Sequence, residues 1–298
     1  MRIAVTGSTG TLGSQVVGLL AAGGLTASPG AEHGGHEVLA LARRPDAVQA
    51  AVGPAAWGAG VVPVRADYDD GPSLASALRG VDVLVFVSSD GDAARMMVHH
   101  HNVVRAAVGA GVGHVVYLSG VDADPGSPFC YAFTNGYTEG LLRRSGCGFS
   151  FARASLFTEF FAAFLRPALV SGALRVPGGE GRVALVSRSD VGRCLAALAL
   201  LPPSGRHHDL TGPATLTFDG VAGVLSEVAG IPVSYTDIPP EVQVEELARA
   251  GEDPWWTYAY STMFASVRQD RWSTVSDEVL RLTGRAPVSV ADAVRPAP

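Results

Sequence analysis

The sequence predicts an α/β fold in which a doubly wound parallel sheet precedes a smaller C-terminal lobe. Short apolar runs alternate with helical stretches through about residue 153, and a glycine-rich turn directly follows the first apolar run. Strands that alternate with helices form βαβ units, and right-handed crossovers then give a Rossmann-type sheet. The alternation is less regular after residue 153. We expect a Rossmann domain at 1–153 and a C-terminal lobe at 154–298, with about 183–212 returning to the sheet.

The predicted strands are four to seven residues long, and most of their side chains are aliphatic. Continuous apolar runs of this length, bounded by glycine or polar residues, are typical of strands buried on both faces. A parallel sheet needs such strands because helices cover both of its faces. In chain order the predicted strands are 2–5, 37–42, 61–65, 81–87, 114–118, 149–152 and 207–210.

The predicted helices fill the intervals between these strands and continue beyond the last of them. The first ends at the glycine pair 23–24, and a Gly/Ala-rich loop at 23–35 then leads to the second strand. The helix at 189–201 is amphipathic, and Asp190 near its start interacts favourably with the helix dipole. The predicted helices are 12–22, 93–110, 137–145, 189–201, 218–229 and 241–251.

The composition excludes several classes of function. All 22 basic residues are arginine, and the chain contains no lysine. This excludes a Schiff base, a P-loop lysine and a Tyr-Lys catalytic pair. A net charge of −6 argues against a nucleic-acid partner. A hydrophobic fraction of 47% excludes a disordered chain.

The cysteines and the N-terminus indicate where the protein works. The three cysteines are scattered without CxxC spacing, which predicts reduced thiols. The chain enters a strand after one charge, unlike a signal peptide, and it has no uncharged apolar run of membrane-spanning length. We therefore expect a cytoplasmic protein without a membrane partner.

The segment after the first strand reads TGSTGTLG, a TGxxGxxG pattern that begins at Thr6. The first glycine permits a tight turn, the second lets a pyrophosphate approach the backbone, and the third lets the helix pack closely. Free N–H groups at the helix start then bind the phosphates. The alternative is an ordinary glycine-rich turn, but the strand before it and the helix after it favour a dinucleotide site. Its predicted loop residues are Gly7, Thr9, Gly10, Thr11, Leu12 and Gly13.

The end of the second strand indicates which dinucleotide binds. A site for NAD usually has an acidic residue there, which binds the ribose 2′-hydroxyl. Here the strand ends in Arg43 and Arg44, with no acid. Guanidinium groups suit a 2′-phosphate, so the pair predicts NADP(H). The alternative interpretation is a solvated basic pair.

These motifs resemble the atypical short-chain dehydrogenases/reductases, and most closely the NmrA-like family, which includes NADPH:quinone oxidoreductases and triphenylmethane reductases. Besides TGxxGxxG, the resemblance rests on ALARRP, RADYDD, GVDVLVFVSS, HHNVVRAAVGAGVGHVVYLS, SRSDVGRCLAALAL and HDLTGPATLT, and it spans nearly the whole chain. It implies an NAD(P)-binding first domain and a substrate-binding lobe. It places Asp67 and Tyr68 near the adenine, and Val87 and Ser88 along the ribose. Ser155, Leu156 and Phe157 would border the nicotinamide.

The wider superfamily uses a serine and a YxxxK motif for catalysis. By position these correspond to Ser119 and to YAFTN, which begins at Tyr131. Asn135 replaces the lysine, which normally holds the ribose and lowers the pKa of the tyrosine. The resemblance implies that Tyr131 donates a hydrogen bond or proton, Ser119 orients the substrate and Asn135 holds the ribose. The alternative is that Tyr131 only forms part of the pocket wall.

Other polar and aromatic clusters have structural interpretations. The histidines at 99–101 point about 100° apart on a helix and cannot share one metal ion, so we predict no metal site. Residues 207–209 (HHD) alternate faces on a strand. Two aromatic clusters have several interpretations: the first is Phe157, Phe160, Phe161 and Phe164, and the second is Trp255, Trp256, Tyr258 and Tyr260. Each cluster either packs in the core or lines a pocket for a flat substrate. For the second cluster a dimer contact is a further alternative.

Together these features predict an NADPH-dependent oxidoreductase. Its acceptor would be a small, planar, electron-poor molecule, such as a quinone, an enone or a polycyclic ketone. Such acceptors need less proton assistance, which suits a site without lysine. One alternative is a redox sensor of the NmrA type, which binds NADP and a protein partner without turnover. The other is an isomerase or cyclase on the same fold. A homodimer is compatible with all three.

Overall fold

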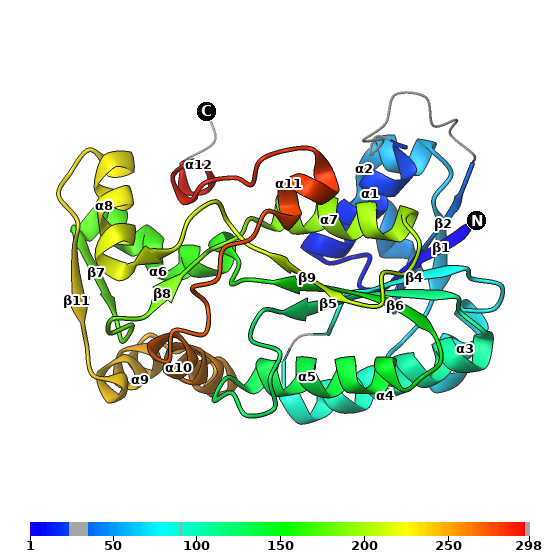
Figure 1. The fold of residues 1–298 in the computed structure, drawn as a ribbon, viewed down its shortest axis with the longest axis horizontal. Coiled ribbons are helices and arrows are strands. Elements are labelled where there is room, and N and C mark those ends of the chain that lie inside the picture. Colours follow the sequence, from blue (N-terminus) through cyan, green and yellow to red (C-terminus); the bar gives the residue numbers. More distant parts are fainter. Residues whose placement is uncertain (24–34, 90, 296–298) are drawn as a thin grey trace.

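Seven parallel strands form the central sheet, in the order β3-β2-β1-β4-β5-β6-β9 (Figure 1). The computed structural model describes residues 1–23, 35–89 and 91–295, apart from the side chains of 162 and 163. Most of the predicted loop at 23–35 therefore lies outside the described residues. All seven predicted strands are present and the doubly wound sheet is confirmed. The strands are β1 (Arg2–Val5), β2 (Glu37–Ala42), β3 (Val62–Arg65), β4 (Val83–Phe86), β5 (His114–Gly120), β6 (Gly148–Ala154) and β9 (His207–Leu210).

Helices cover both faces of the sheet (Figure 1). On one face α1 packs against α2 and α7, and on the other α4 packs against α3 and α5. Aliphatic side chains from β1, β4 and β5 fill both interfaces, and Phe86 and Tyr117 are fully buried. These helices are α1 (Thr11–Ala21), α2 (Val48–Gly58), α3 (Gly71–Ala77), α4 (Ala93–Ala110), α5 (Cys130–Arg143) and α7 (Arg188–Leu200).

Two helices differ from their predictions. The helix α7 is not amphipathic: nine of its 13 residues are buried, because it lies between the sheet, α1 and α11 (Glu278–Thr283). The helix α5 begins at Cys130, seven residues before its predicted start at 137. Tyr131 and Asn135 therefore lie on consecutive turns of one helix.

The remaining elements form a lobe beyond the carboxyl ends of the strands (Figure 1). In this lobe β7 pairs with β11 and β8 pairs with β10, and its core contains Phe161, Phe218 and Phe264. Of the region 183–212, α7 and β9 lie with the main sheet. The lobe elements are α6 (Thr158–Ser171), β7 (Ala173–Val176), β8 (Arg182–Val183), β10 (Leu216–Thr217), α8 (Phe218–Ala229), β11 (Ser234–Asp237), α9 (Pro240–Arg249), α10 (Pro254–Arg268) and α12 (Val290–Val294).

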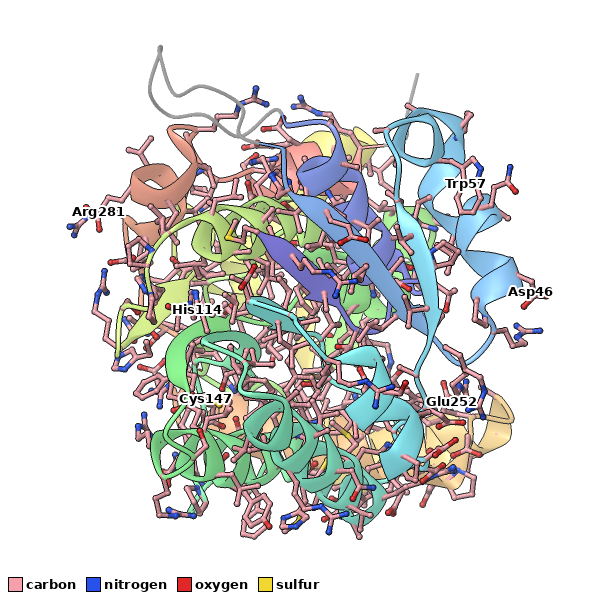
Figure 2. The ribbon with its side chains drawn as sticks, turned by 90° about the vertical axis from the view of Figure 1, so that its right-hand side faces the viewer. Asp46, Trp57, His114, Cys147, Glu252 and Arg281 are labelled. Atoms are coloured by element: carbon pink, nitrogen blue, oxygen red, sulfur yellow. The ribbon has the colours of Figure 1, made fainter. Side chains whose placement is uncertain are left out.

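The two edges of the sheet differ in character. Figure 2 faces the amino ends of the strands, where His114 begins β5 and Cys147 precedes β6. Burial lowers the pKa of His114 to about 4, so this histidine is neutral and packs as part of the core. The loops that follow β1 to β4 gather at the opposite edge. In doubly wound folds ligands bind at that carboxyl edge.

Among the helices that the structure describes, none is long and apolar enough to cross a membrane.

Candidate active site

Two adjoining cavities lie at the carboxyl edge of the sheet. The larger has a volume of about 550 Å³ and is lined by the loops that follow β1, β2, β3 and β4. The smaller has a volume of about 240 Å³ and is lined mainly by apolar side chains from β5, α5, α6 and α10. Ser88 and Ser89 line both cavities. A molecule in the larger cavity can therefore contact a molecule in the smaller one.

The glycine loop is shaped by close backbone contacts. Gly7 has a φ of +62°, which L side chains rarely adopt. A Cβ atom on Gly13 would lie 2.2 Å from the carbonyl oxygen of Gly7, so only glycine lets α1 approach the loop this closely. Gly10 has an ordinary φ of −84°. These conformations agree with the tight turn and close packing predicted for Gly7 and Gly13.

Hydrogen bonds fix the loop to its neighbours. The hydroxyl of Thr6 accepts a 2.9 Å bond from the amide of Val87. The buried hydroxyl of Ser8 donates a 2.9 Å bond to the carbonyl of Leu41. Ser8 therefore holds the loop against the end of β2, a structural role for the one serine of the motif.

The N-terminus of α1 faces the larger cavity. No side chain caps this helix end within the described part of the chain, and its first N–H groups carry a partial positive charge. An anion such as a pyrophosphate is stabilised there. All six predicted loop residues line the cavity, namely Gly7, Thr9, Gly10, Thr11, Leu12 and Gly13.

The two arginines at the end of β2 occupy different positions. Arg43 lines the larger cavity, whereas Arg44 is not among its lining residues. Both are exposed, and neither forms an ion pair with a carboxylate of the described residues. The guanidinium of Arg43 is therefore available to a phosphate at this end of the cavity.

The residues predicted near the adenine and ribose also line the larger cavity. The hydroxyl of Tyr68 donates a 2.6 Å bond to the carbonyl of Val87, which joins the loops after β3 and β4. Asp67 accepts a bond from the amide of Asp69 in the same turn. The hydroxyl of Ser88 donates to the carbonyl of Leu118. These contacts give the cavity a fixed wall opposite the glycine loop.

The residues predicted to border the nicotinamide, Ser155, Leu156 and Phe157, line the smaller cavity. The amide of Ser155 donates to the carbonyl of Leu210, which fixes the backbone. Its hydroxyl is buried, and no described residue forms a hydrogen bond with it. Buried hydroxyl groups are rarely left unpaired, so this group is suited to a polar atom of a ligand.

The three predicted catalytic residues also line the smaller cavity, and each has a different hydrogen-bond partner. The hydroxyl of Ser119 donates a 2.7 Å bond to the carboxylate of Glu139. The hydroxyl of Tyr131 donates to the carbonyl of Gly91 and accepts from the indole N–H of Trp255. The structure therefore brings these side chains into one cavity, and their catalytic roles stay predictions.

Asn135 is oriented by a buried tyrosine. Its Oδ1 accepts a 2.9 Å bond from the hydroxyl of Tyr117, a residue of β5. Burial raises the pKa of Tyr117, so this hydroxyl remains a donor. The amide nitrogen of Asn135 lies on the side of Gly120, which also lines the smaller cavity. The asparagine can therefore present a neutral donor there.

Glu139 is fully buried. Its carboxylate accepts bonds from Arg143 at 2.8 Å and from Arg153 at 2.7 Å, in addition to the bond from Ser119. Arg153 comes from β6, whereas Glu139 and Arg143 both lie on α5. The cluster joins α5 to two strands beneath the smaller cavity.

The three consecutive histidines at 99–101 lie in three different environments. Atom Nδ1 of His99 lies 3.0 Å from the hydroxyl of Ser89, and Nε2 lies 2.9 Å from Asp69. His100 bonds to Thr138, and burial lowers its pKa to about 3, so it is neutral. His101 is exposed. Within the described ranges no group of three or more His, Cys, Asp or Glu side chains is placed to hold a metal ion.

Several polar residues of the larger cavity were missed by the sequence analysis. The guanidinium of Arg188, at the start of α7, lies 5.8 Å above the ring of Phe157 and forms no ion pair with a carboxylate of the described residues, whereas its backbone amide donates to the carboxylate of Glu159. Asp69, Arg95 and His99 also line this cavity and form a hydrogen-bonded group. The SRSD motif contains Arg188, but nothing local to that motif indicates its neighbour in space.

The aromatic sets divide between cavity and core. Phe157, Phe160 and Trp256 line the smaller cavity, together with Phe129 and Trp272. Phe161 and Phe164 instead pack on Phe264 in the lobe core. On α10, Tyr260 packs on Phe160 and Phe164, whereas Tyr258 is 51% exposed. The aromatic side chains are therefore divided between the lobe core and the wall of the cavity, and the flat substrate and the dimer contact stay predictions.

Comparison with known proteins gives consistent matches. A model of the NmrA-like family matches residues 1–255. The NAD(P)H azoreductase of Xenophilus azovorans is 30% identical over 286 residues, covering 95% of this chain and 93% of the azoreductase. The structure of the NADPH-dependent quinone oxidoreductase of Escherichia coli complexed with NADPH is similar at a TM-score of 0.86 and 27% identity, covering 98% of both chains. The Citrobacter sp. triphenylmethane reductase complexed with NADP(H) gives a TM-score of 0.84 at 28% identity, again covering 98% of both chains.

Proposed function

The chain belongs to the NmrA-like family and is an NAD(P)H-dependent oxidoreductase that uses NADP(H), and from this premise we propose that it reduces planar, electron-poor acceptors such as quinones, enones or polycyclic ketones. The observation that carries this proposal is the aromatic cavity of about 240 Å³ that adjoins the larger polar cavity at Ser88 and Ser89. One cavity suits the cofactor, and the other suits a flat hydrophobic molecule beside it.

The donor groups that line the larger cavity suit the phosphates of NADPH. The start of α1 and Gly10 would hold the pyrophosphate, and Arg43 would hold the 2′-phosphate. Asp67 and Tyr68 would lie near the adenine. The unpaired hydroxyl of Ser155 would bond to the carboxamide of the nicotinamide. When bound, NADPH supplies a hydride to the acceptor.

The aromatic side chains that line the smaller cavity suit a conjugated acceptor. Phe160 and Trp256 offer ring faces on which a conjugated molecule stacks. Tyr131 would turn its hydroxyl from the carbonyl of Gly91 to an oxygen of the acceptor. Asn135 would bond to the ribose through its amide nitrogen. The relatives named above act on quinones, azo compounds and triphenylmethane dyes according to their names, and such conjugated molecules suit this cavity.

An acceptor panel tests the proposal. Purified protein with NADPH should oxidise the cofactor in the presence of at least one quinone, enone, polycyclic ketone or azo compound. Trp256→Leu should raise the KM for the acceptor about tenfold or more, because a ring face is lost, with the Kd of NADPH nearly unchanged. Tyr258→Leu is the matched control, since that side chain lies on the same helix but is exposed, and it should leave both constants unchanged.

The outcome distinguishes the alternatives. Binding of NADPH without oxidation by any acceptor would contradict the proposal and favour the sensor or the isomerase. Equal effects of the Trp256 and Tyr258 variants would show that the acceptor binds outside the aromatic cavity.

A further inference from the structure

Three polar side chains from separate segments form a hydrogen-bonded chain along one wall of the larger cavity. The hydroxyl of Ser89, after β4, lies 3.0 Å from Nδ1 of His99 on α4. Atom Nε2 of His99 lies 2.9 Å from Oδ1 of Asp69, in the loop after β3. His99 is 7% exposed, whereas the side chain of Asp69 is 50% exposed. The chain therefore runs from the protein surface to the junction of the two cavities.

Asp69 is fixed and ionised at the outer end of this chain. Its second oxygen, Oδ2, accepts a 2.5 Å bond from Arg95, one turn before His99 on α4. The hydrogen bonds from Arg95 and His99 lower the pKa of Asp69. The other side chains around the imidazole are Tyr68, whose ring centroid is 5.5 Å away, and neutral His100. The carboxylate therefore holds Nε2 protonated and leaves Nδ1 to Ser89.

The hydroxyl of Ser89 differs from those of its neighbours at the junction in the kind of partner to which it is hydrogen-bonded. The hydroxyl of Ser88 donates to the carbonyl of Leu118. The hydroxyl of Tyr131 donates to the carbonyl of Gly91. The hydroxyl of Ser119 donates to Glu139. Ser89 instead has an imidazole nitrogen as its partner, and that nitrogen can supply a proton when the ring is charged.

We propose that Ser89 protonates the reduced acceptor and that His99, held by Asp69, resupplies the proton to Ser89. This inference rests on the proposed function and adds a proton source to it. A quinone gains two electrons and one hydrogen with the hydride from NADPH, and an oxygen then carries a negative charge. That oxygen takes the proton of Ser89, Ser89 takes the proton from Nδ1 of charged His99, and the ring regains a proton from water. In the overall reaction, quinone, NADPH and one proton give hydroquinone and NADP⁺.

In this proposal Ser89 is the catalytic residue, and His99 and Asp69 are positioning residues that act through it. The chain has no lysine to lower the pKa of Tyr131. A second route for the proton explains how such a site reduces acceptors that must be protonated. Tyr131 is then required for its hydrogen bond to the acceptor, and not for its proton.

The test compares two acceptors with different proton requirements. Reduction of a quinone such as menadione consumes a proton, whereas a cationic triphenylmethane dye such as malachite green becomes neutral by hydride transfer alone. The steady-state kcat is measured for both acceptors with the full chain and saturating NADPH. The variants are His99→Gln, Ser89→Ala and Asp69→Asn. The matched control is His101→Gln, which removes an exposed histidine from the same helix.

The relay predicts a selective loss. His99→Gln and Ser89→Ala should lower kcat for menadione about 10²-fold and change kcat for the dye less than about twofold. Asp69→Asn should give a smaller loss with menadione only, because the ring keeps its hydrogen bond but loses the neighbouring charge. His101→Gln should change neither rate.

Other results would overturn the relay. An equal loss with both acceptors would show that His99 only maintains the cavity, and an unchanged menadione rate would show that another group supplies the proton. A parent protein that reduces the dye but no quinone would contradict the relay alone. A parent protein that oxidises NADPH with neither acceptor would contradict the proposed function.

Discussion

The glycines of the first loop differ in what a side chain would meet. A Cβ atom on Gly13 would lie 2.2 Å from the carbonyl oxygen of Gly7, a contact with rigid backbone. A Cβ atom on Gly10 would meet only the same oxygen at 3.3 Å, and its backbone conformation suits any residue. Gly13 is therefore required for the close packing of α1 on the loop, whereas the packing around Gly10 does not require a glycine, and we propose that Gly10 serves the approach of a ligand.

This difference predicts that alanine at position 13 affects stability, whereas alanine at position 10 affects the binding of NADPH. Gly13→Ala should cost about 2–3 kcal/mol of folding free energy, because the helix must move away from the loop. Gly10→Ala should lower the affinity for NADPH about tenfold or more, while the Tm changes by only a few degrees. Thermal unfolding and NADPH titration measure both effects. Normal NADPH binding by Gly10→Ala would show that the pyrophosphate lies elsewhere.

The residues of the site were predictable only where their signal is local. The glycine motif shows its strand, turn and helix within a few residues, so its geometry could be predicted. Ser89, His99 and Asp69 come from three different segments, and their contact depends on how α4 packs beside β3 and β4. The sequence places His99 on a helix, but nothing in it reveals that this histidine lies within hydrogen-bond distance of Asp69.

The elements of the sheet were more predictable than those of the lobe. Most strands of the sheet contain a short apolar run, which is a strong strand signal, whereas β9 reads HHDL and has none. In the lobe, β8 and β10 are two residues long and have no periodicity to detect. The helix α7 shows a different limit, because it was predicted to be amphipathic, whereas the sheet, α1 and α11 together bury nine of its 13 residues.

One buried carboxylate, that of Asp122, links the lobe to the sheet. Asp122 follows β5 and accepts hydrogen bonds from Ser266 of α10 at 2.8 Å and from Ser127 at 2.5 Å. It also forms an ion pair with Arg271 at 3.1 Å. Through these bonds Asp122 holds α10, and with it Trp256, against the smaller cavity.

Asp122→Ala should therefore destabilise the protein by about 2–4 kcal/mol, because it leaves several buried donors unpaired. It should also raise the KM for the acceptor more than that for NADPH. Asp124→Ala is the control: its exposed carboxylate also binds Arg271, and exposed pairs contribute only about 0–1 kcal/mol. Denaturant unfolding and steady-state kinetics compare the two variants. Equal destabilisation by both would contradict the role given to Asp122.

At the scale of the whole molecule, the two cavities lie at the carboxyl edge of the sheet, beside the elements of the lobe. The sheet supplies the polar cavity, with the glycine loop, Arg43 and Tyr68 on its walls. The lobe supplies aromatic walls for the smaller cavity, including Phe160 and Trp256. We propose that the polar cavity holds the cofactor, that the aromatic cavity holds the acceptor, and that the reactive end of the cofactor lies where the two cavities join.

A crystal structure of the protein with NADP⁺ bound tests this claim most directly. The expected result places the 2′-phosphate at Arg43, the pyrophosphate at the N-terminus of α1 and the carboxamide at the hydroxyl of Ser155. Carbon C4 of the nicotinamide should then face the aromatic cavity, beside Ser89. A nicotinamide that points away from this cavity, or that fills it and leaves no room for an acceptor, would contradict the account.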